Sequence, residues 1–183
     1  DIGTRNFLSV GKPVKKVADF AGLKTRIVPV PLHKAIWEAV GTAPVGLPYG
    51  EVYGALQTKV IDAVEINVSS ILGENLWEVG KHLTLTGHYP WHAVIACNKA
   101  KFASLPKDVQ DAMKQAGRDS TAPTHEYAKQ QDISARDGLK AKGVTIHTLE
   151  DLDEMKKKML PLIEQYAKQS PLIDAFVKAA QAG

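Results

Sequence analysis

Short apolar segments alternate with short amphipathic segments in the first third of the chain, and this alternation constrains the fold most. Three segments rich in Val, Ile and Leu are predicted strands: residues 23–29, 43–48 and 59–67. Two predicted helices lie between them, from Pro31 to Gly41 and over residues 49–58. Because parallel strands are joined by helical crossovers, the pattern predicts an α/β fold with a sheet covered by helices on its faces.

The first of these strands carries a guanidinium, that of Arg26, close to its middle in the stretch GLKTRIVPV. An unpaired buried cation costs several kcal/mol, on the order of the desolvation penalty of a single ion. Arg26 must therefore reach solvent or meet an anion. One possibility is an ion pair within its own domain, with Glu51, Asp62 or Glu65.

The other possibility is an anion from outside, because ligands of open parallel sheets bind beyond the carboxyl ends of the strands. Arg26 lies near the end of the first predicted strand, Tyr49 follows the second, and residues 65–67 close the third. We expect a cation, a phenol and polar groups to meet at one rim of the sheet.

The rest of the chain predicts a further strand and a long helix. Residues 90–98, PWHAVIACN, are a predicted strand with Cys97 as a small buried residue. A helix is expected from an N-cap at Ser104 to Lys142, with a kink or break at Pro123 and Gly143 as its terminator. A helix of this length predicts a bridge between two lobes. Shorter elements are expected at residues 81–88, 144–148, after the Thr148–Asp151 capping pattern, and from Ser170 onward.

Composition excludes several function classes. The 183 residues carry a net charge of +3 with scattered basic residues, which does not indicate nucleic-acid binding. No apolar stretch is long enough to span a bilayer, so we expect no membrane insertion. No HExxH motif, phosphate-binding loop or nucleophile elbow is present, so no catalytic constellation is indicated.

Several separated segments together resemble one protein family. They are GTRNF, KPVKKVADFAGLKTRI, GTAPVGLPYGEVYGALQTKVIDAVE, WEVGKHLTLTGH and SLPKDVQDAM, in this order. The chain resembles the solute-binding proteins of tripartite ATP-independent periplasmic (TRAP) transporters, of the dicarboxylate-binding-protein-like family. The resemblance implies an exported periplasmic receptor with two α/β lobes of the type II binding-protein kind, which delivers organic acids such as dicarboxylates to the transporter's membrane subunits.

The resemblance also implies a division of the chain. Residues 1–90 and 132–183 would form the second lobe, and residues 91–131 a strand and long helix crossing toward a first lobe. Since the chain begins with DIGTRNF, without a methionine or a signal peptide, we expect a piece trimmed from a longer protein, with most of the first lobe outside it.

The family pattern assigns ligand-binding positions as well. Arg26 matches the arginine that pairs with the ligand carboxylate, and a planar guanidinium suits that role because it forms two parallel hydrogen bonds. The remaining positions expected at the ligand are Arg5, Tyr49, Glu65, Ile66 and Asn67. Neither a cofactor nor a metal ion is predicted. The alternatives are a small α/β enzyme acting on a carboxylate substrate and a helical interaction module.

Overall fold

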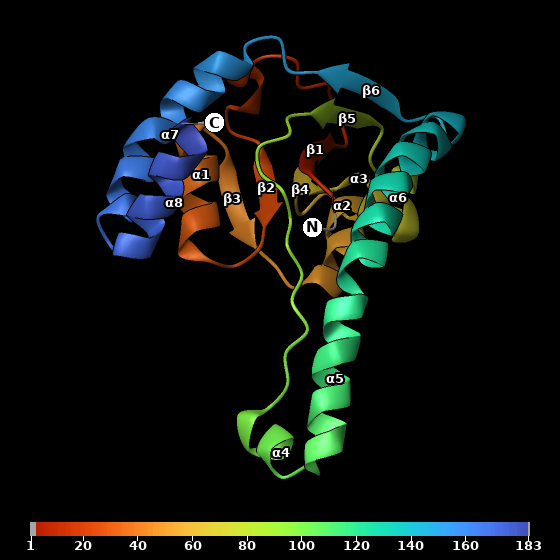
Figure 1. Ribbon diagram of the computed structural model, residues 1–183. Coiled ribbons are helices and arrows are strands. Elements are labelled where there is room, and N and C mark those ends of the chain that lie inside the picture. The colour runs from red at the N-terminus through yellow and green to blue at the C-terminus, as the bar shows by residue number, and fades with distance from the viewer. Residues whose placement is uncertain (1–2, 183) are drawn as a thin grey trace.

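The computed structural model describes residues 3–182, which form one six-stranded mixed sheet with helices on both faces (Figure 1). In sheet order the strands are β3 (Ala43–Gly46), β2 (Lys24–Ile27), β4 (Ala63–Asn67), β1 (Arg5–Ser9), β5 (His82–Leu85) and β6 (Thr145–Thr148). β2 runs parallel to β3 and β4, β1 runs antiparallel to β4 and β5, and β5 runs parallel to β6. The predicted α/β class is confirmed.

Helices occupy most of the connections between strands. The α-helices are α1 (Pro31–Ala39), α2 (Val52–Gln57), α3 (Val68–Gly73), α4 (Lys99–Ala103), α5 (Lys107–Asp119), α6 (Thr121–Ala141), α7 (Leu152–Ala167) and α8 (Pro171–Ala182). Short 3-10 helices are η1 (Val17–Phe20), η2 (Tyr49–Glu51) and η3 (Leu76–Glu78). Across residues 3–182, no helix combines the length and apolar character that a bilayer crossing needs.

The sheet separates two hydrophobic clusters because strand side chains alternate between its faces. Val64 and Ile66 of β4 pack on the face covered by α2, α3 and α6. Ala63 of the same strand packs on the other face, where α1 and α7 lie. There Phe7 contacts Phe20 and Trp37, with ring centroids 4.8 and 5.2 Å apart. The aromatic cluster therefore anchors α1 to the strands that carry the candidate site.

The predicted long helix is divided into α5 and α6 at Ser120. Proline removes an N–H and its ring clashes with the carbonyl four residues earlier. For Pro123 that residue is Asp119, the last of α5, so the expected break is confirmed. Gly143 has a φ of +80° and terminates α6 as predicted.

The N-cap prediction at Ser104 is wrong, because Ser104 follows the last residue of α4 and Pro106 is the residue before α5.

The predicted strand at residues 90–98 is also wrong. Residues 91–98 have no regular structure, and Cys97, expected to be buried, is exposed. Val94 and Ile95 are 87% and 90% exposed. An apolar run becomes a strand only where a neighbouring strand takes its backbone hydrogen bonds, and here pairing is limited to the first residues, through a bridge between Thr4 and Pro90.

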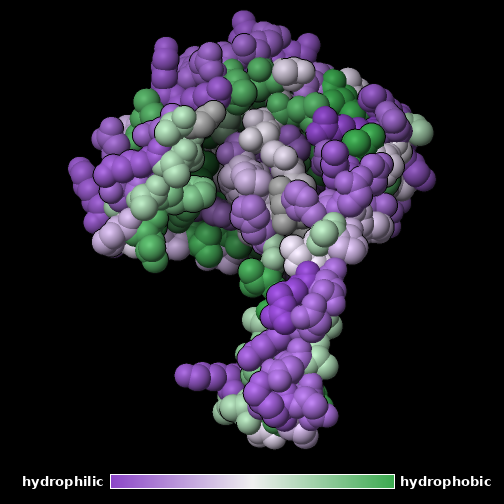
Figure 2. Space-filling model, viewed as in Figure 1, coloured by the Kyte–Doolittle hydropathy of each residue, from purple (hydrophilic) through white to green (hydrophobic). Residues whose placement is uncertain are grey.

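The segment that holds residues 91–98, α4 and α5 extends away from the sheet as an arm (Figure 1). Figure 2 shows hydrophobic residues along the lower border of the main body, on the side from which the arm extends. The exposed apolar side chains therefore lie on the arm as well as on the lobe.

Close packing around Gly80 generates a stability prediction. A Cβ at Gly80 would lie 2.7 Å from two side-chain carbons of Leu8, which is fully buried. Gly80→Ala should therefore destabilise the fold by roughly 1–3 kcal/mol through overpacking. Gly54→Ala in the exposed part of α2 is the matched control, since nothing lies within 4 Å of its added carbon. The control should gain roughly 0.5–1 kcal/mol. Urea denaturation midpoints measure both, and equal midpoints would contradict the packing argument.

Candidate functional site

The carboxyl ends of β2, β3 and β4 lie side by side, as the sequence predicted. In the parallel register, Arg26 of β2 lies opposite Val45 of β3 and Val64 of β4. Leu47 directly follows β3, and Asn67 is the last residue of β4. Polar groups from three neighbouring strand ends are therefore available at one rim.

Arg26 is held at this rim by a backbone carbonyl. Its side chain is buried, with the residue 3% exposed. Nε and Nη2 both donate to the carbonyl oxygen of Leu47, at 3.0 and 2.9 Å. Within residues 3–182, no Asp or Glu oxygen lies within 4.0 Å of its nitrogens. The ion pair with Glu51, Asp62 or Glu65 that the sequence left open is therefore not formed.

Burial also affects the charge of Arg26. It lowers the pKa of the guanidinium from its ordinary value, the carboxylate of Glu65 opposes this, and the charge of Arg5 adds to it. An arginine nonetheless stays protonated in proteins. The positive charge at the rim thus has a hydrogen-bond acceptor but no carboxylate in contact among the described residues.

Glu65 is occupied by a different arginine. Arg5 on β1 and Glu65 on the neighbouring β4 are 4% and 0% exposed. Nε of Arg5 donates to one carboxylate oxygen and Nη2 to the other, the latter at 2.7 Å. Nη1 of Arg5 also donates to Oδ1 of Asn67, at 3.3 Å. This bidentate arrangement is the strongest form of a guanidinium–carboxylate pair, and the two charges neutralise each other.

Three further side chains surround the Glu65 carboxylate. The hydroxyl of Tyr89 donates to Oε2 at 3.1 Å. The rings of His88 and His33 each place a nitrogen near an oxygen, at 3.5 and 3.8 Å. The His88 contact is not a hydrogen bond, because its Nε2 has no partner with hydrogen-bond geometry among the described residues. The ring of Trp91 lies 4.4 Å from Cζ of Arg5 and covers the pair.

Sequence reasoning missed the contributions of His33, His88, Tyr89 and Trp91. The stretch HYPW follows the end of β5 after two intervening residues, and polar and aromatic residues after a strand end are a signal for a functional loop. The apolar run at residues 90–98, which overlaps this stretch, favours a strand instead. His33 lies in the first turn of α1, and only the folded chain brings it to Tyr89, with Nε2 3.2 Å from the hydroxyl.

The protonation states at the site follow from burial and contacts. Burial alone would raise the pKa of Glu65, but the nearby ring of His88 and the hydrogen bonds and charge of Arg5 outweigh it, and the pKa is lowered below 4.5. Burial lowers the pKa of His33 and of His88 below 6.5 and raises that of Tyr89. Near neutral pH the carboxylate is therefore charged, and the two imidazoles and the phenol are not. Among these side chains, two guanidiniums and one carboxylate leave a net charge of one positive unit.

The other predicted site residues have different placements. Tyr49 begins η2, is 47% exposed, and lies near enough to influence the pKa of Arg26. Asn67 is 3% exposed and contacts Arg5. Ile66 is 1% exposed and packs in the hydrophobic cluster on the face of the sheet opposite to that of its neighbour Glu65. The structure thus brings five of the six residues to one area and places Ile66 in the core.

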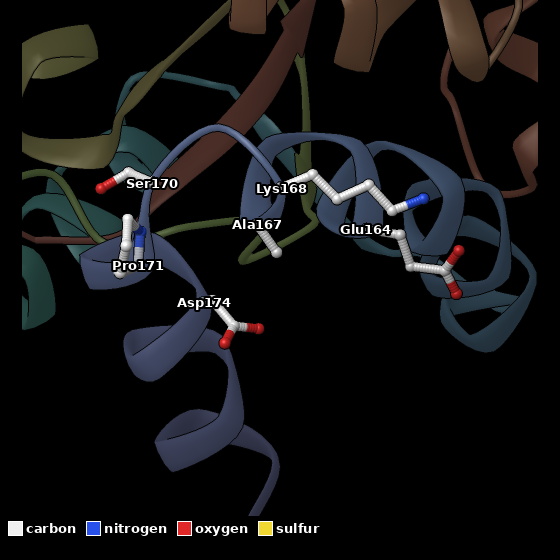
Figure 3. Close-up of a pocket in the computed structure, with 6 residues that line it drawn as sticks. All are labelled: Glu164, Ala167, Lys168, Ser170, Pro171 and Asp174. Atoms are coloured by element: carbon white, nitrogen blue, oxygen red, sulfur yellow. The ribbon is translucent and has the colours of Figure 1, made fainter.

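A cavity elsewhere in the lobe is unrelated to these strand ends. It has a volume of about 530 Å³ and lies where α7 turns into α8. Figure 3 shows Glu164 of α7, Lys168 directly after α7 and Asp174 of α8 around this turn. None of its lining residues belongs to β2, β3 or β4, so it is separate from the candidate site.

Comparison with known proteins identifies the family. The chain matches the family model described as bacterial extracellular solute-binding protein, family 7, over residues 1–169. This chain belongs to that family. The membership expected from the resemblance is confirmed, and with it the expectation that the chain does not belong to an enzyme family.

Two curated relatives illustrate the match. A solute-binding protein of Sulfitobacter sp. is 33% identical over 177 residues, which cover 94% of this chain and 53% of the relative. The C4-dicarboxylate-binding periplasmic protein DctP of Rhodobacter capsulatus is 33% identical over 180 residues, covering 96% and 54%. The chain spans about half the length of the curated relatives it matches.

Solved structures share the fold. The sugar acid binding protein DctPAm of Advenella mimigardefordensis, in complex with galactonate, superposes with a TM-score of 0.94 at 25% identity. The match covers 60% of that protein's chain and all of this chain. A TRAP periplasmic solute-binding protein of Bradyrhizobium sp., in complex with galacturonate, gives a TM-score of 0.88 at 28% identity, with coverages of 60% and 99%. The predicted TRAP-type fold is therefore confirmed.

Loss of the Glu65 charge should lower the stability of the folded protein. Glu65→Gln would leave the buried Arg5 without its counter-ion, and breaking a buried pair in this way costs roughly 3–5 kcal/mol. Glu38→Gln, which removes an exposed carboxylate from a pair with Lys34, is the control and should change stability by roughly 0.5 kcal/mol or less. Chemical denaturation of both variants checks this. Equal effects would mean that the buried pair does not hold β1 to β4.

The lowered pKa values of His33 and His88 predict that the folded protein loses stability in mild acid. Because the folded-state pKa values of His33 and His88 are lowered, the unfolded chain binds protons more readily below pH 6.5. The stability should be fully present above that pH and fall as the pH drops below it. A second loss, from the lowered pKa of Glu65, should begin below about pH 4.5. Thermal denaturation between pH 7.5 and 4 measures the profile, and His33→Gln should flatten its first part. A profile without slope between pH 6.5 and 5 would contradict the assignment.

Proposed function

We propose that this chain forms part of a periplasmic receptor of a TRAP transporter, which captures an organic acid and delivers it to the membrane permease. Membership of the extracellular solute-binding family supports the receptor role. The observation that carries the ligand class is Arg26, a buried guanidinium at the strand ends with no carboxylate in contact among residues 3–182. Such a cation is stabilised when an anion arrives from outside.

The hydrogen bonds of Arg26 suit a carboxylate clamp. A guanidinium has five N–H groups in a planar fork. The Leu47 carbonyl takes one from Nε and one from Nη2, which fixes the plane of the fork. Nη1 donates to no residue that the structure describes, and Nη2 carries a second N–H. These two nitrogens form the end of the fork, the geometry that accepts both oxygens of one carboxylate.

The charge of the site favours a ligand with one carboxylate. The pair of Arg5 and Glu65 is neutral, so Arg26 supplies the net positive charge among the side chains of this site. Relatives with solved structures are described with bound galacturonate, glucuronate and galactonate, which are sugar acids with one carboxylate each. We therefore place sugar acids ahead of dicarboxylates as ligands for this chain.

Residues 1–90 and 132–183 would act as one lobe of the receptor, with residues 91–131 crossing to another. The arm of residues 91–98, α4 and α5 projects from the sheet, and its exposed Val94 and Ile95 need a hydrophobic partner. The matched relatives are nearly twice as long as this chain, which leaves room for such a lobe in the whole protein. Closure of two lobes over the ligand would exclude water from the Arg26 clamp.

Calorimetry on the whole protein tests the clamp. Titration with galacturonate, glucuronate and galactonate should show binding of at least one of them by the wild type. Arg26→Lys replaces the fork by a point charge and should weaken binding at least tenfold, or about 1.4 kcal/mol. Lys24→Met, which removes an exposed cation from the same strand, is the control and should bind normally. Equal affinity of wild type and Arg26→Lys would reject the clamp.

Recovery of the ligand separates a receptor from an enzyme. The bound acid should be released unchanged from the denatured complex and should give the same proton NMR spectrum as the starting material. Conversion of the acid into another compound would contradict the receptor function.

A further inference from the structure

Two histidines meet at the far edge of the sheet, away from the candidate site. His82 begins β5 and His147 lies on β6, the edge strand. Nδ1 of His82 is 3.3 Å from Nε2 of His147, and the ring centroids are 5.5 Å apart. Ser9 of β1 lies opposite both His82 and Ala63, the first residue of β4. The histidines are therefore level with the amino end of β4, and the strands β4 and β1 separate them from β2, which carries Arg26.

The register of two parallel strands brings the rings together. His82 lies opposite Thr145 and Thr84 opposite His147, so the two histidines are diagonal neighbours. Residues two apart on a strand share a face, which places both imidazoles on the same side of the sheet. Both are half-buried, so each keeps contact with solvent. The sequence places them 65 residues apart, and nothing in the family assignment uses them.

The distance between the nitrogens matches cis coordination of one metal ion. Zinc–imidazole bonds are about 2.0–2.1 Å long. Two nitrogens 3.3 Å apart then subtend an angle of about 104–111° at the ion, which includes the tetrahedral value of about 109°. We propose that His82 and His147 form a bis-imidazole site for a divalent transition-metal ion such as Zn²⁺ or Ni²⁺. The ion would tie the edge strand β6 to β5.

The surroundings set the strength of this site. Imidazole binds metal in its neutral form. Burial, the neighbouring His82 and the charge of Lys15 all lower the pKa of His147, so the neutral form is already favoured near pH 7. Among residues 3–182 no third His, Cys, Asp or Glu completes a cluster, so water would fill the other positions. Lys15 repels the ion as well, and the site should be of moderate affinity.

Isothermal titration of the metal-free whole protein with Ni²⁺ at pH 7.5 tests the proposal. The wild type should bind one ion at this site. His82→Ala and His147→Ala should each weaken that binding at least tenfold, and Lys15→Gln should tighten it. His92→Ala and His125→Ala remove exposed histidines elsewhere and serve as matched controls that leave it unchanged. An unchanged titration in the double variant His82→Ala/His147→Ala would overturn the proposal.

A measurement on the wild type avoids dependence on variants. Histidine ring signals of His82 and His147 should shift together in NMR spectra on addition of Zn²⁺ and return on chelation with EDTA. Acidification to pH 5.5 should release the ion because protons compete for the same nitrogens. Ring signals that stay unchanged up to millimolar Zn²⁺ would show a hydrogen-bonded pair of histidines only, and would reject the metal site.

Discussion

The ion pair between Arg5 and Glu65 is the interaction on which the rest of this lobe depends. It joins β1 and β4, the two central strands, and both partners are almost completely buried. Burying two charges is tolerable here because the geometry is bidentate and the remaining oxygen positions receive a hydroxyl and face two imidazoles. Glu65 is the acidic residue with the largest electrostatic effect on the pKa of Arg26, but its carboxylate is paired with Arg5. Arg26 is therefore left without an acidic side chain in contact among the described residues.

This division of roles explains why two buried arginines can coexist in one lobe. Arg5 is neutralised by Glu65 and capped by Trp91, so it contributes to the fold. Arg26 is oriented by the Leu47 carbonyl and keeps its charge, so it contributes a net attraction for anions. The stability of the strands and the readiness of the rim for an anion thus arise from one carboxylate paired with one of two cations. The proposed receptor function rests on that imbalance.

Local patterns predicted the elements that depend on near neighbours. Proline at the start of α1, Pro123 opposite the end of α5, and Gly143 with a positive φ act through backbone sterics, which any chain obeys locally. The apolar run at residues 90–98 failed as a strand because a strand needs a hydrogen-bonding neighbour that the described residues do not supply beyond Pro90. The Ser104 N-cap failed because a short helix, α4, ends there first.

Residue order alone was enough to predict the α/β class, the position of Arg26 at a strand end and the family to which the chain belongs. These features depend on hydrophobic periodicity and on motifs whose residues lie close together along the chain. The partner of each arginine, the burial of Ile66 on the other face, and the meeting of His33 with Tyr89 or of His82 with His147 required the folded chain. Such pairings join residues far apart in sequence, and strand register and pleat, which no local pattern specifies, select them from many alternatives of similar composition.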